Sequence, residues 1–171
     1  MEHLAAHIRN IPDFPQPGIQ FKDITPLIKN PVALRQTVQA LSEPFKNKGI
    51  TAVAGMEARG FIFGSLTALE LGVGFIPLRK PGKLPFSVES ITYDLEYGSA
   101  ELQIHSDALN SNDSVLLIDD LIATGGTAAA SCHLIEKLGA EVIGCAFVVE
   151  LDFLNGREKL AKYQVHSLIK Y

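Results

Sequence analysis

Two adjacent carboxylates, Asp119 and Asp120, are followed by a short loop of hydroxyl-bearing residues and glycines, Thr124, Gly125, Gly126 and Thr127. Paired glycines let backbone N–H groups approach an anion closely, and the two threonine hydroxyls add hydrogen-bond donors. The loop lacks both the lysine of GxxxxGK[ST] and the spacing of GxGxxG, so it is neither of the common nucleotide-binding motifs. These residue types predict a cradle for a phosphate group.

The carboxylates of Asp119 and Asp120 would repel a phosphate, so we expect them to contact another part of the same ligand. Vicinal ribose hydroxyls, a ligand-bound Mg²⁺ or a developing positive charge would each suit them. A sugar phosphate satisfies both halves of the motif, with its phosphate in the loop and its hydroxyls facing the acids. The alternative is a strand-to-helix turn whose acids face solvent, and the length of the motif argues against it.

The segments on either side of this loop are predicted to be a buried strand and a helix. Residues 115–118 are consecutive apolar residues, typical of a strand covered on both faces, and we expect that strand to end at the aspartates. From Thr127 the sequence predicts a helix that ends at Gly139, and its dipole would favour negative charge at the loop. We expect the backbone to approach the phosphate at Gly126, with a left-handed φ there.

Two further loops carry cations that could meet the same ligand, and each follows a predicted strand. A guanidinium beside a glycine suits a pyrophosphate, and a basic loop between two prolines could fold over a polyanion. Taken alone, either loop is also typical of solvated surface. The cations are Arg59, after the strand at residues 50–55, and Arg79, Lys80 and Lys83, after the strand at residues 73–78.

The N-terminal part of the chain is predicted to pack as a short helix, an arm and a longer helix. Residues 2–11 have the apolar stripe of an amphipathic helix. Residues 11–26 are rich in proline, which forces an extended or turning course. Asn30 followed by Pro31 predicts the start of a second helix, which Pro44 should end or bend.

The remaining elements complete an alternation of strands and helices. A helix after Gly60 reaches Leu71. Residues 90–97 and 101–105 predict a hairpin, residues 142–151 a strong strand and residues 165–169 an edge strand. This order predicts an α/β fold with a central, mostly parallel, twisted sheet and helices on both faces. In the helix that reaches Leu71, the side chains expected to face the core are Ile62, Leu66 and Leu69.

Length and composition indicate one soluble domain, residues 1–171. The formal net charge of −4 gives no electrostatic case for nucleic acid or an anionic membrane as a partner. We expect Cys132 and Cys145 to be reduced core residues of a cytoplasmic protein. We see no signal peptide at the N-terminus and no apolar run near the roughly 20 residues of a membrane span.

The stretch from Val115 to Thr127 closely resembles the phosphoribosyl pyrophosphate-binding signature of the type I phosphoribosyltransferases. Other segments narrow the resemblance to the adenine phosphoribosyltransferases, and together they cover nearly the whole chain. These segments are PDFPxPGIxFKDITP at residues 12–26, LEYG at residues 95–98, and VEL followed by GREKL at residues 149–160. The resemblance implies transfer of the 5-phosphoribosyl group to adenine in purine salvage, giving AMP and pyrophosphate.

The resemblance also implies roles for residues around the sugar phosphate. Ala123, Thr124, Gly125, Gly126 and Thr127 would anchor the 5′-phosphate, while Asp119 and Asp120 would bind the ribose hydroxyls. Arg59 and Lys83 would neutralise the pyrophosphate, with Arg79 supplied across the interface of a homodimer. Mg²⁺ would be held by substrate and water rather than directly by the protein. A cis peptide bond is implied at Glu57-Ala58.

For the base, the resemblance implies a site in a small hood formed by about residues 1–30 and 150–171. The base would rest against Phe21 and bond the backbone of Lys22, with Leu151 as the candidate for the opposite apolar wall. Glu96 of LEYG would lie near the reacting nitrogen and is the candidate catalytic residue. Two alternatives stay open: another purine phosphoribosyltransferase, acting on hypoxanthine, guanine or xanthine, and a non-catalytic regulator that senses phosphoribosyl pyrophosphate.

Overall fold

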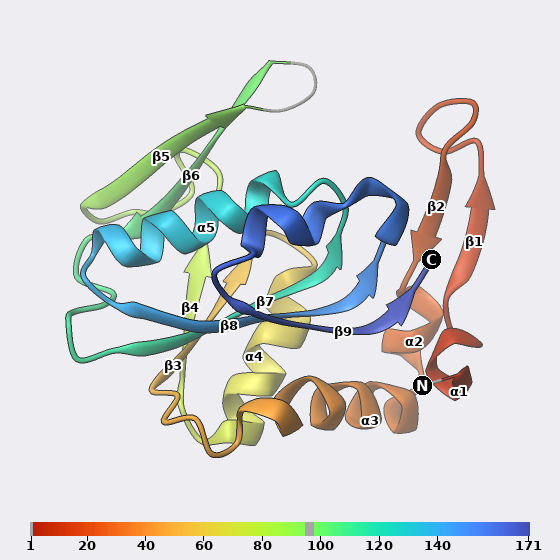
Figure 1. The fold of residues 1–171 in the computed structure, drawn as a ribbon, viewed down its shortest axis with the longest axis horizontal. Coiled ribbons are helices and arrows are strands. Elements are labelled where there is room, and N and C mark those ends of the chain that lie inside the picture. The colour runs from red at the N-terminus through yellow and green to blue at the C-terminus, as the bar shows by residue number, and fades with distance from the viewer. Residues whose placement is uncertain (1, 95–97) are drawn as a thin grey trace.

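The computed structural model describes residues 2–94 and 98–171, and within them five parallel strands form the central sheet in the order β4-β3-β7-β8-β9 (Figure 1). The apolar run of the sequence lies in β7, the middle strand, where both faces are covered. The predicted parallel α/β sheet is therefore confirmed. The strands are β3 (Ala52–Met56), β4 (Gly74–Leu78), β7 (Ser114–Ile122), β8 (Glu141–Glu150) and β9 (Gln164–Lys170).

Helices cover both faces of this sheet, as the sequence predicts. In Figure 1, α3 and α4 lie below the sheet and α5 lies above it. None of the helices in the described part of the chain is long and apolar enough to span a bilayer. The helices are α1 (Glu2–Ala5), α2 (Thr25–Lys29), α3 (Pro31–Ser42), α4 (Gly60–Leu71) and α5 (Gly126–Lys137), with short 3₁₀ turns η1 (Glu43–Phe45), η2 (Asp152–Leu154) and η3 (Gly156–Leu160).

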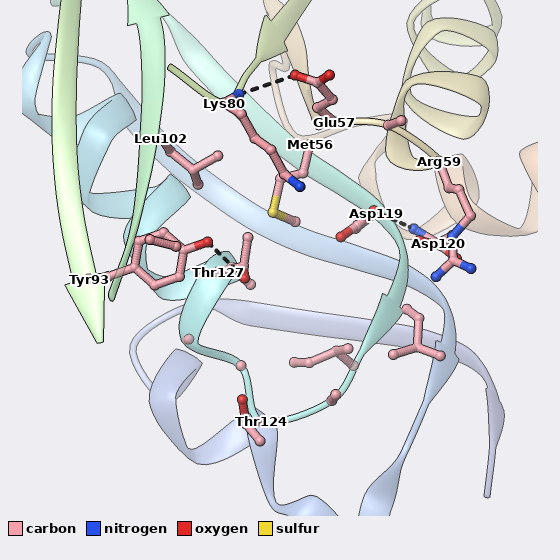
Figure 2. A pocket seen from close by; sticks show the side chains of 18 of the residues that line it. Met56, Glu57, Arg59, Lys80, Tyr93, Leu102, Asp119, Asp120, Thr124 and Thr127 are labelled. Carbon is pink, nitrogen blue, oxygen red and sulfur yellow. Dashed lines mark hydrogen bonds and ion pairs between the residues drawn. The ribbon is translucent and has the colours of Figure 1, made fainter. Parts of the chain in front are cut away.

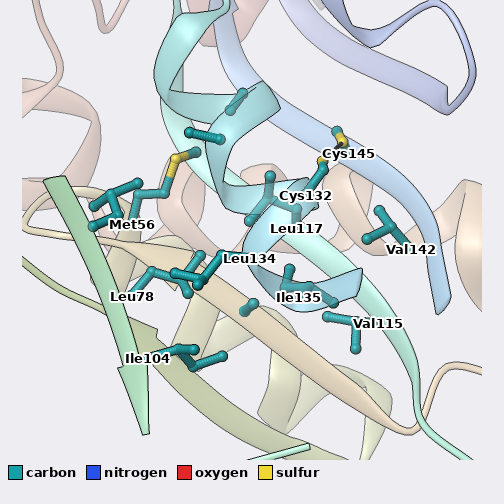
Figure 3. Packing of buried hydrophobic residues seen from close by; sticks show 14 of the residues in the cluster. Met56, Leu78, Ile104, Val115, Leu117, Cys132, Leu134, Ile135, Val142 and Cys145 are labelled. Carbon is teal, nitrogen blue, oxygen red and sulfur yellow. Dashed lines mark hydrogen bonds between the residues drawn. The ribbon is translucent and has the colours of Figure 1, made fainter. Parts of the chain in front are cut away.

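The hydrophobic core is divided by the sheet into two clusters, and β7 contributes to both. Val115 and Leu117 pack with the buried residues of α5 and of the hairpin formed by β5 (Val88–Asp94) and β6 (Ser99–His105) (Figure 3). Leu116 and Ile118 pack on the other face, against residues of α3 and α4 such as Phe63. Successive side chains of a strand point to opposite faces, so a run that is apolar at every position supplies both cores.

Two antiparallel hairpins flank the central sheet. One joins β1 (Arg9–Pro12) to β2 (Gln20–Asp23), and the other joins β5 (Val88–Asp94) to β6 (Ser99–His105). The second confirms the hairpin predicted around residues 90–105, and it packs against α5 (Figure 1).

The N-terminal segment differs from its prediction in two places. The helix predicted for residues 2–11 is wrong beyond Ala5, because Arg9–Pro12 is a strand paired with β2. An isolated helix of this length is marginal, so strand pairing, with an Arg9–Asp23 ion pair beside it, prevails. Within the arm predicted to be extended, Thr25–Lys29 is a helix, and its proline occupies an N-terminal position where a missing N–H costs little.

The predicted start of α3 is confirmed by its cap. The Asn30 side-chain oxygen accepts hydrogen bonds from the N–H groups of Val32 (3.0 Å) and Ala33 (3.1 Å). The helix ends at Ser42, and Pro44 lies in the 3₁₀ turn that follows.

The buried face of α4 differs in part from the predicted one, because Ile62 packs half-buried against the core but Leu69 does not. Leu69 is 78% exposed, whereas Phe63, Thr67 and Ala68 are buried. The helix is apolar around much of its circumference, so its hydrophobic pattern does not select a face, and the sheet and α3 decide which side is covered.

Candidate active site

A cavity of about 610 Å³ opens at the carboxyl ends of β3, β4 and β7 (Figure 2). This edge is where open α/β sheets bind ligands, because the loops that leave the strands converge there. The predicted phosphate loop forms one wall, and the loop after β3 forms the opposite wall. The lining residues are Met56, Glu57, Ala58, Arg59, Lys80, Pro81, Tyr93, Ala100, Glu101, Leu102, residues 119–127 and Ala128.

The phosphate loop, residues 123–127, joins the end of β7 to the start of α5. Gly125 has a left-handed φ of 76°, and the helix begins at the next residue. The expectation of a left-handed φ at Gly126 is therefore wrong by one position, because Gly126 is already helical. The unsatisfied N–H groups of the first turn of a helix lie at this end of α5, and they are suited to an anion.

The strand before this loop is longer than predicted. β7 does not end at the aspartates but continues to Ile122, pairing with β8 through Asp119 opposite Phe147 and Leu121 opposite Val149. Because both aspartates are strand residues, their side chains project to opposite sides of β7.

The two carboxylates have different partners. Asp120 is almost fully buried, and its Oδ2 lies 2.8 Å from the Arg59 Nε. One oxygen of Asp119 accepts a hydrogen bond from the Asp120 N–H at 2.8 Å. Burial raises the pKa of both groups; the negative charge of Asp120 raises the pKa of Asp119 further, whereas Arg59 counteracts the rise at Asp120.

Gly60 lets α4 begin directly against these strand residues. A Cβ at this position would lie 2.6 Å from the Asp119 Oδ1 and 3.1 Å from the Ile118 carbonyl oxygen. Real Cβ atoms essentially never come as close as 2.6 Å, so a side chain at position 60 would force Asp119 to shift. The glycine next to Arg59 thus has a packing reason, in addition to the ligand approach that the sequence suggested.

The cations of the basic loop divide between the cavity and its rim. Arg79 donates to both carboxylate oxygens of Glu57, from Nε and Nη2 at 3.2 Å each, and this pairing lowers the pKa of Glu57. Lys83 accepts a hydrogen bond from the Arg79 Nη1 through its carbonyl oxygen at 3.2 Å. Neither Arg79 nor Lys83 is among the described residues that line the cavity.

Lys80 does line the cavity, although from the sequence we named it only as a member of the basic loop and gave it no role of its own. Figure 2 shows its side chain extending into the cavity beside Met56. The backbones of Arg79 and Gln103 exchange two hydrogen bonds in an isolated antiparallel bridge. Because successive residues of an extended chain point to opposite sides, the side chain of Lys80 points away from the side on which Arg79 lies. The only signal available in the sequence was the position of Lys80 within the basic run.

Tyr93, also not predicted to lie in the site, reaches the cavity from β5. Its hydroxyl lies 3.2 Å from the hydroxyl of Thr127 in the phosphate loop. Its ring packs with Ile91 against the core on the α5 side. The alternation of apolar residues in this strand was a usable signal for the ring, but the contact with Thr127 depends on how the hairpin docks.

Phe21 lies on a second cavity of about 460 Å³, between the β1–β2 hairpin, α2 and α4. The ring packs edge to face on Phe14, with centroids 5.1 Å apart, and the Arg59 guanidinium carbon lies 5.2 Å from its centroid. Arg59 is the residue common to both cavity linings within the described chain.

The other described residues predicted for the base, Lys22 and Leu151, do not line this second cavity. The Lys22 ammonium donates to Asn10 at 2.7 Å and lies 3.5 Å from the centroid of the Tyr171 ring. Leu151 is half-buried against the core on the α4 side, and its N–H donates to Ile122 at 3.0 Å. Glu96, the predicted catalytic residue, lies outside the described residues.

Two further features of the described chain concern the loops and metals. The Glu57-Ala58 peptide bond is cis, as the sequence resemblance implied. No group of three or more His, Cys, Asp or Glu side chains within residues 2–94 and 98–171 is arranged to hold a metal ion.

Comparison with known proteins gives a consistent result. A family model of the phosphoribosyl transferase domain matches residues 29–169. The adenine phosphoribosyltransferase of Methylococcus capsulatus is 67% identical over 171 residues, covering 100% of both chains. The crystal structure of adenine phosphoribosyltransferase from Rhodothermus marinus matches with a TM-score of 0.95 at 50% identity, covering 99% of this chain and 97% of that one.

A second similar structure was determined with ligands. It is the adenine phosphoribosyltransferase from Saccharomyces cerevisiae, complexed with D-2,5-dideoxy-2,5-imino-altritol 1,6-bisphosphate and adenine. Its TM-score is 0.92 at 43% identity, covering 98% of this chain and 97% of that one.

Proposed function

The chain belongs to the phosphoribosyl transferase family, and we propose that it transfers the 5-phosphoribosyl group of phosphoribosyl pyrophosphate to adenine in purine salvage, giving AMP and pyrophosphate. The observation that carries this proposal is a single cavity with three kinds of wall. One wall is the helix N-terminus at residues 123–127, the second is the carboxylate pair, and the third holds Arg59 and Lys80. These walls suit the phosphate, the hydroxyls and the pyrophosphate of the donor, respectively.

In the proposed complex, Ala123 to Thr127 bind the 5′-phosphate and Asp119 and Asp120 bind the ribose hydroxyls. Arg59 and Lys80 neutralise the leaving pyrophosphate from inside the cavity. We retain Arg79 and Lys83 as further pyrophosphate ligands, reached when the basic loop closes over the donor.

We propose that adenine binds between the two cavities, on the side of Arg59 where Phe21 lies. The partly exposed ring of Phe21 offers an apolar surface for the base. The backbone of Lys22 has an N–H donor and a carbonyl acceptor for the polar groups of the base. Leu151 would complete the pocket from the end of β8. This arrangement requires the β1–β2 hairpin and the β8 end to approach each other around the base.

The chemistry needs little covalent participation by the protein. The C1′–O bond to pyrophosphate breaks as N9 of adenine attacks C1′ from the opposite face, and positive charge develops on the ribose ring. The carboxylates at the ribose and the cations at the pyrophosphate stabilise these charges where they develop. We propose that Glu96 accepts or holds the proton of the imidazole ring of adenine, a contribution of about 10²–10⁴-fold.

Mg²⁺ fits this site as a companion of the donor. The carboxylates of Asp119 and Asp120 supply oxygen atoms of the kind that Mg²⁺ prefers, at the place where the donor hydroxyls and pyrophosphate would meet. We propose that substrate and water would provide most of its ligands, and that a bound Mg²⁺ would supply positive charge to stabilise the leaving group.

We propose that the protein works as a homodimer in the cytoplasm. Cys132 and Cys145 are both buried and free, with sulfur atoms 3.6 Å apart, which is compatible with a reducing compartment. Sedimentation of the purified chain should give twice the monomer mass; a monomer with full activity would contradict the dimer but not the reaction.

The reaction is tested by offering each purine base separately with phosphoribosyl pyrophosphate and Mg²⁺. We expect AMP from adenine, with kcat/KM at least about 10³-fold above that for hypoxanthine or guanine, because backbone groups that match the amine are left unpaired by a carbonyl. Comparable turnover of hypoxanthine would assign the chain to another purine specificity. Absence of turnover with every base, despite donor binding, would favour a sensor.

A further inference from the structure

The phosphate loop rests on the backbone of a segment distant in sequence, and their contact leaves no room for a side chain. A Cβ added at Gly156 would overlap the carbonyl oxygen of Ala123 and lie 2.9 Å from the Gly125 nitrogen. A Cβ added at Gly125 would in turn overlap the Gly156 carbonyl oxygen. The atoms approached are backbone atoms, which cannot move aside as the end of a flexible side chain can.

Gly156 is held in place by the residue that follows it. The Arg157 guanidinium donates to both oxygens of Glu150, at 2.9 and 2.7 Å, and to the Val165 carbonyl oxygen at 2.9 Å. Glu150 is buried at the end of β8, and its hydrogen bond with Arg157 holds the pKa of its carboxyl at about 2. This forked pair ties the first residues of η3 to the carboxyl end of β8 and, through Val165, to the start of β9.

The same segment is tied to the strand that leads into the loop. The N–H of Leu151, next to Glu150, donates to the carbonyl oxygen of Ile122, the last residue of β7, at 3.0 Å. At its other end η3 is anchored by Leu160, which is fully buried in the core on the α5 side. The backbone at Gly156 is therefore a fixed support beneath residues 123–125.

We propose that Gly156, held by the Arg157–Glu150 pair, is a positioning residue that sets the place of the phosphate-loop backbone and thereby the affinity for the 5′-phosphate. The inference rests on the proposed function, since it assigns the loop to that phosphate. Gly156 acts only through Ala123 and Gly125, so its replacement weakens ligands that carry a sugar phosphate and spares those bound by the cations across the cavity.

The test compares Gly156→Ala with the unchanged full-length chain, using ribose 5-phosphate and magnesium pyrophosphate as separate calorimetric probes. A displacement of about 1 Å in the groups that position a substrate can cost about 10²-fold in reaction rate, and we expect a loss of the same order in affinity at this loop. We expect ribose 5-phosphate to bind Gly156→Ala about 10²-fold more weakly, and pyrophosphate to keep its affinity within about twofold. KM for the donor should rise, and KM for adenine should stay unchanged.

Gly74→Ala is the matched control, because a Cβ at Gly74 meets nothing within 4 Å and φ there is not left-handed. It should leave both affinities unchanged. Equal ribose 5-phosphate affinity of Gly156→Ala and the unchanged chain would overturn the inference, and so would an equal loss for both probes, which would indicate general damage.

If Gly156→Ala does not fold, a second variant, Arg157→Lys, tests the same positioning role. Arg157→Lys keeps the charge near Glu150 but cannot form the fork, so we expect the same selective loss of ribose 5-phosphate affinity with faster amide exchange at residues 123–126. Undiminished affinity in Arg157→Lys would overturn the inference. The proposed function fails separately, if the unchanged chain neither binds ribose 5-phosphate nor forms AMP.

Discussion

Among single residues, the two aspartates of β7 show how the residues of the proposed donor site can lower stability. Burial removes both carboxylates from water and raises their pKa values. The positive charge of Arg59 counteracts this rise more strongly at Asp120 than at Asp119. Such groups are common where a ligand, rather than the protein, completes the set of partners. The hydroxyls of a ribose would donate hydrogen bonds to these carboxylates and so favour their ionised forms.

The first prediction is that Asp119→Asn stabilises the free protein at pH 8. An acid with a raised folded-state pKa destabilises the fold where it is ionised, and this effect vanishes below its unfolded pKa of about 3.9. Each tenfold change in the acid dissociation constant on folding corresponds to about 1.4 kcal/mol. Urea unfolding should therefore show a gain at pH 8 that disappears near pH 3, together with a loss of donor binding.

The exposed Asp107 provides the control, since Asp107→Asn removes a charge from the surface and should change neither property. A stability of Asp119→Asn equal to that of the unchanged chain at pH 8 would mean that burial does not raise the pKa of Asp119.

Lys80 carries the second prediction, because it is the lysine in the described cavity lining. Removing one preorganised donor at a developing charge typically costs about 10²–10³-fold. We expect Lys80→Met to lower kcat/KM for phosphoribosyl pyrophosphate by about 10²-fold, with little change in KM for adenine. Steady-state kinetics against the exposed-site variant Lys48→Met checks this, and equal values for the two variants would remove Lys80 from the site.

At the level of secondary structure, the site depends on where elements begin. α5 begins at the phosphate loop, and α4 begins at Gly60 against β7. α3 begins after Asn30, which caps the helix and does not line the cavity. The first two starts are shaped by close backbone approach, whereas the third is shaped by a local side-chain cap. Of these three features, only the cap of α3 can be removed by a substitution that leaves the site residues unchanged.

We therefore predict that Asn30→Ala lowers stability and leaves catalysis unchanged. Two N–H groups of α3 lose their acceptor, which costs about 1 kcal/mol for a typical cap. Chemical denaturation should show this loss at unchanged kcat and KM. Asn112→Ala, in an exposed turn, should be neutral, and a neutral result for Asn30→Ala as well would mean that water replaces the cap.

At the scale of the whole molecule, one sheet is shared by two hydrophobic clusters. β7 contributes to both, so neither cluster can be lost while the other keeps its packing. The phosphate loop contacts η3 at Gly156, and η3 is tied to the end of β8 and the start of β9 in the same sheet. Ligand binding at the loop should therefore stabilise the chain as one unit.

The fourth prediction is a single calorimetric unfolding transition that shifts upward with ribose 5-phosphate. A ligand that binds only the folded state at 100 times its Kd adds about 2.7 kcal/mol. The entire transition should move, as followed by calorimetry and by far-ultraviolet circular dichroism together. A separate transition of the β1–β2 hairpin at lower temperature, with a midpoint that does not shift with ligand, would contradict the prediction that the chain unfolds as a single domain.

The sequence by itself determined the features that depend on neighbouring residues. The apolar run of β7, the glycine loop after it, the cap of α3 and the hairpin at residues 90–105 each have a local physical cause, so they could be predicted. The alternation of such elements was sufficient for a parallel α/β sheet. The phosphate loop and the carboxylate pair were identified for the same reason, as one continuous stretch.

Only the tertiary structure decided the features that depend on distant partners. Pairing with β8 carries β7 past the aspartates, the bridge with Gln103 separates Arg79 from Lys80, and packing selects the buried face of α4. The support of the phosphate loop by Gly156 belongs to the same class, since a backbone-to-backbone contact leaves no periodic pattern in the sequence. Strand register and close approach are set by the whole fold, so local residue preferences contain no record of them.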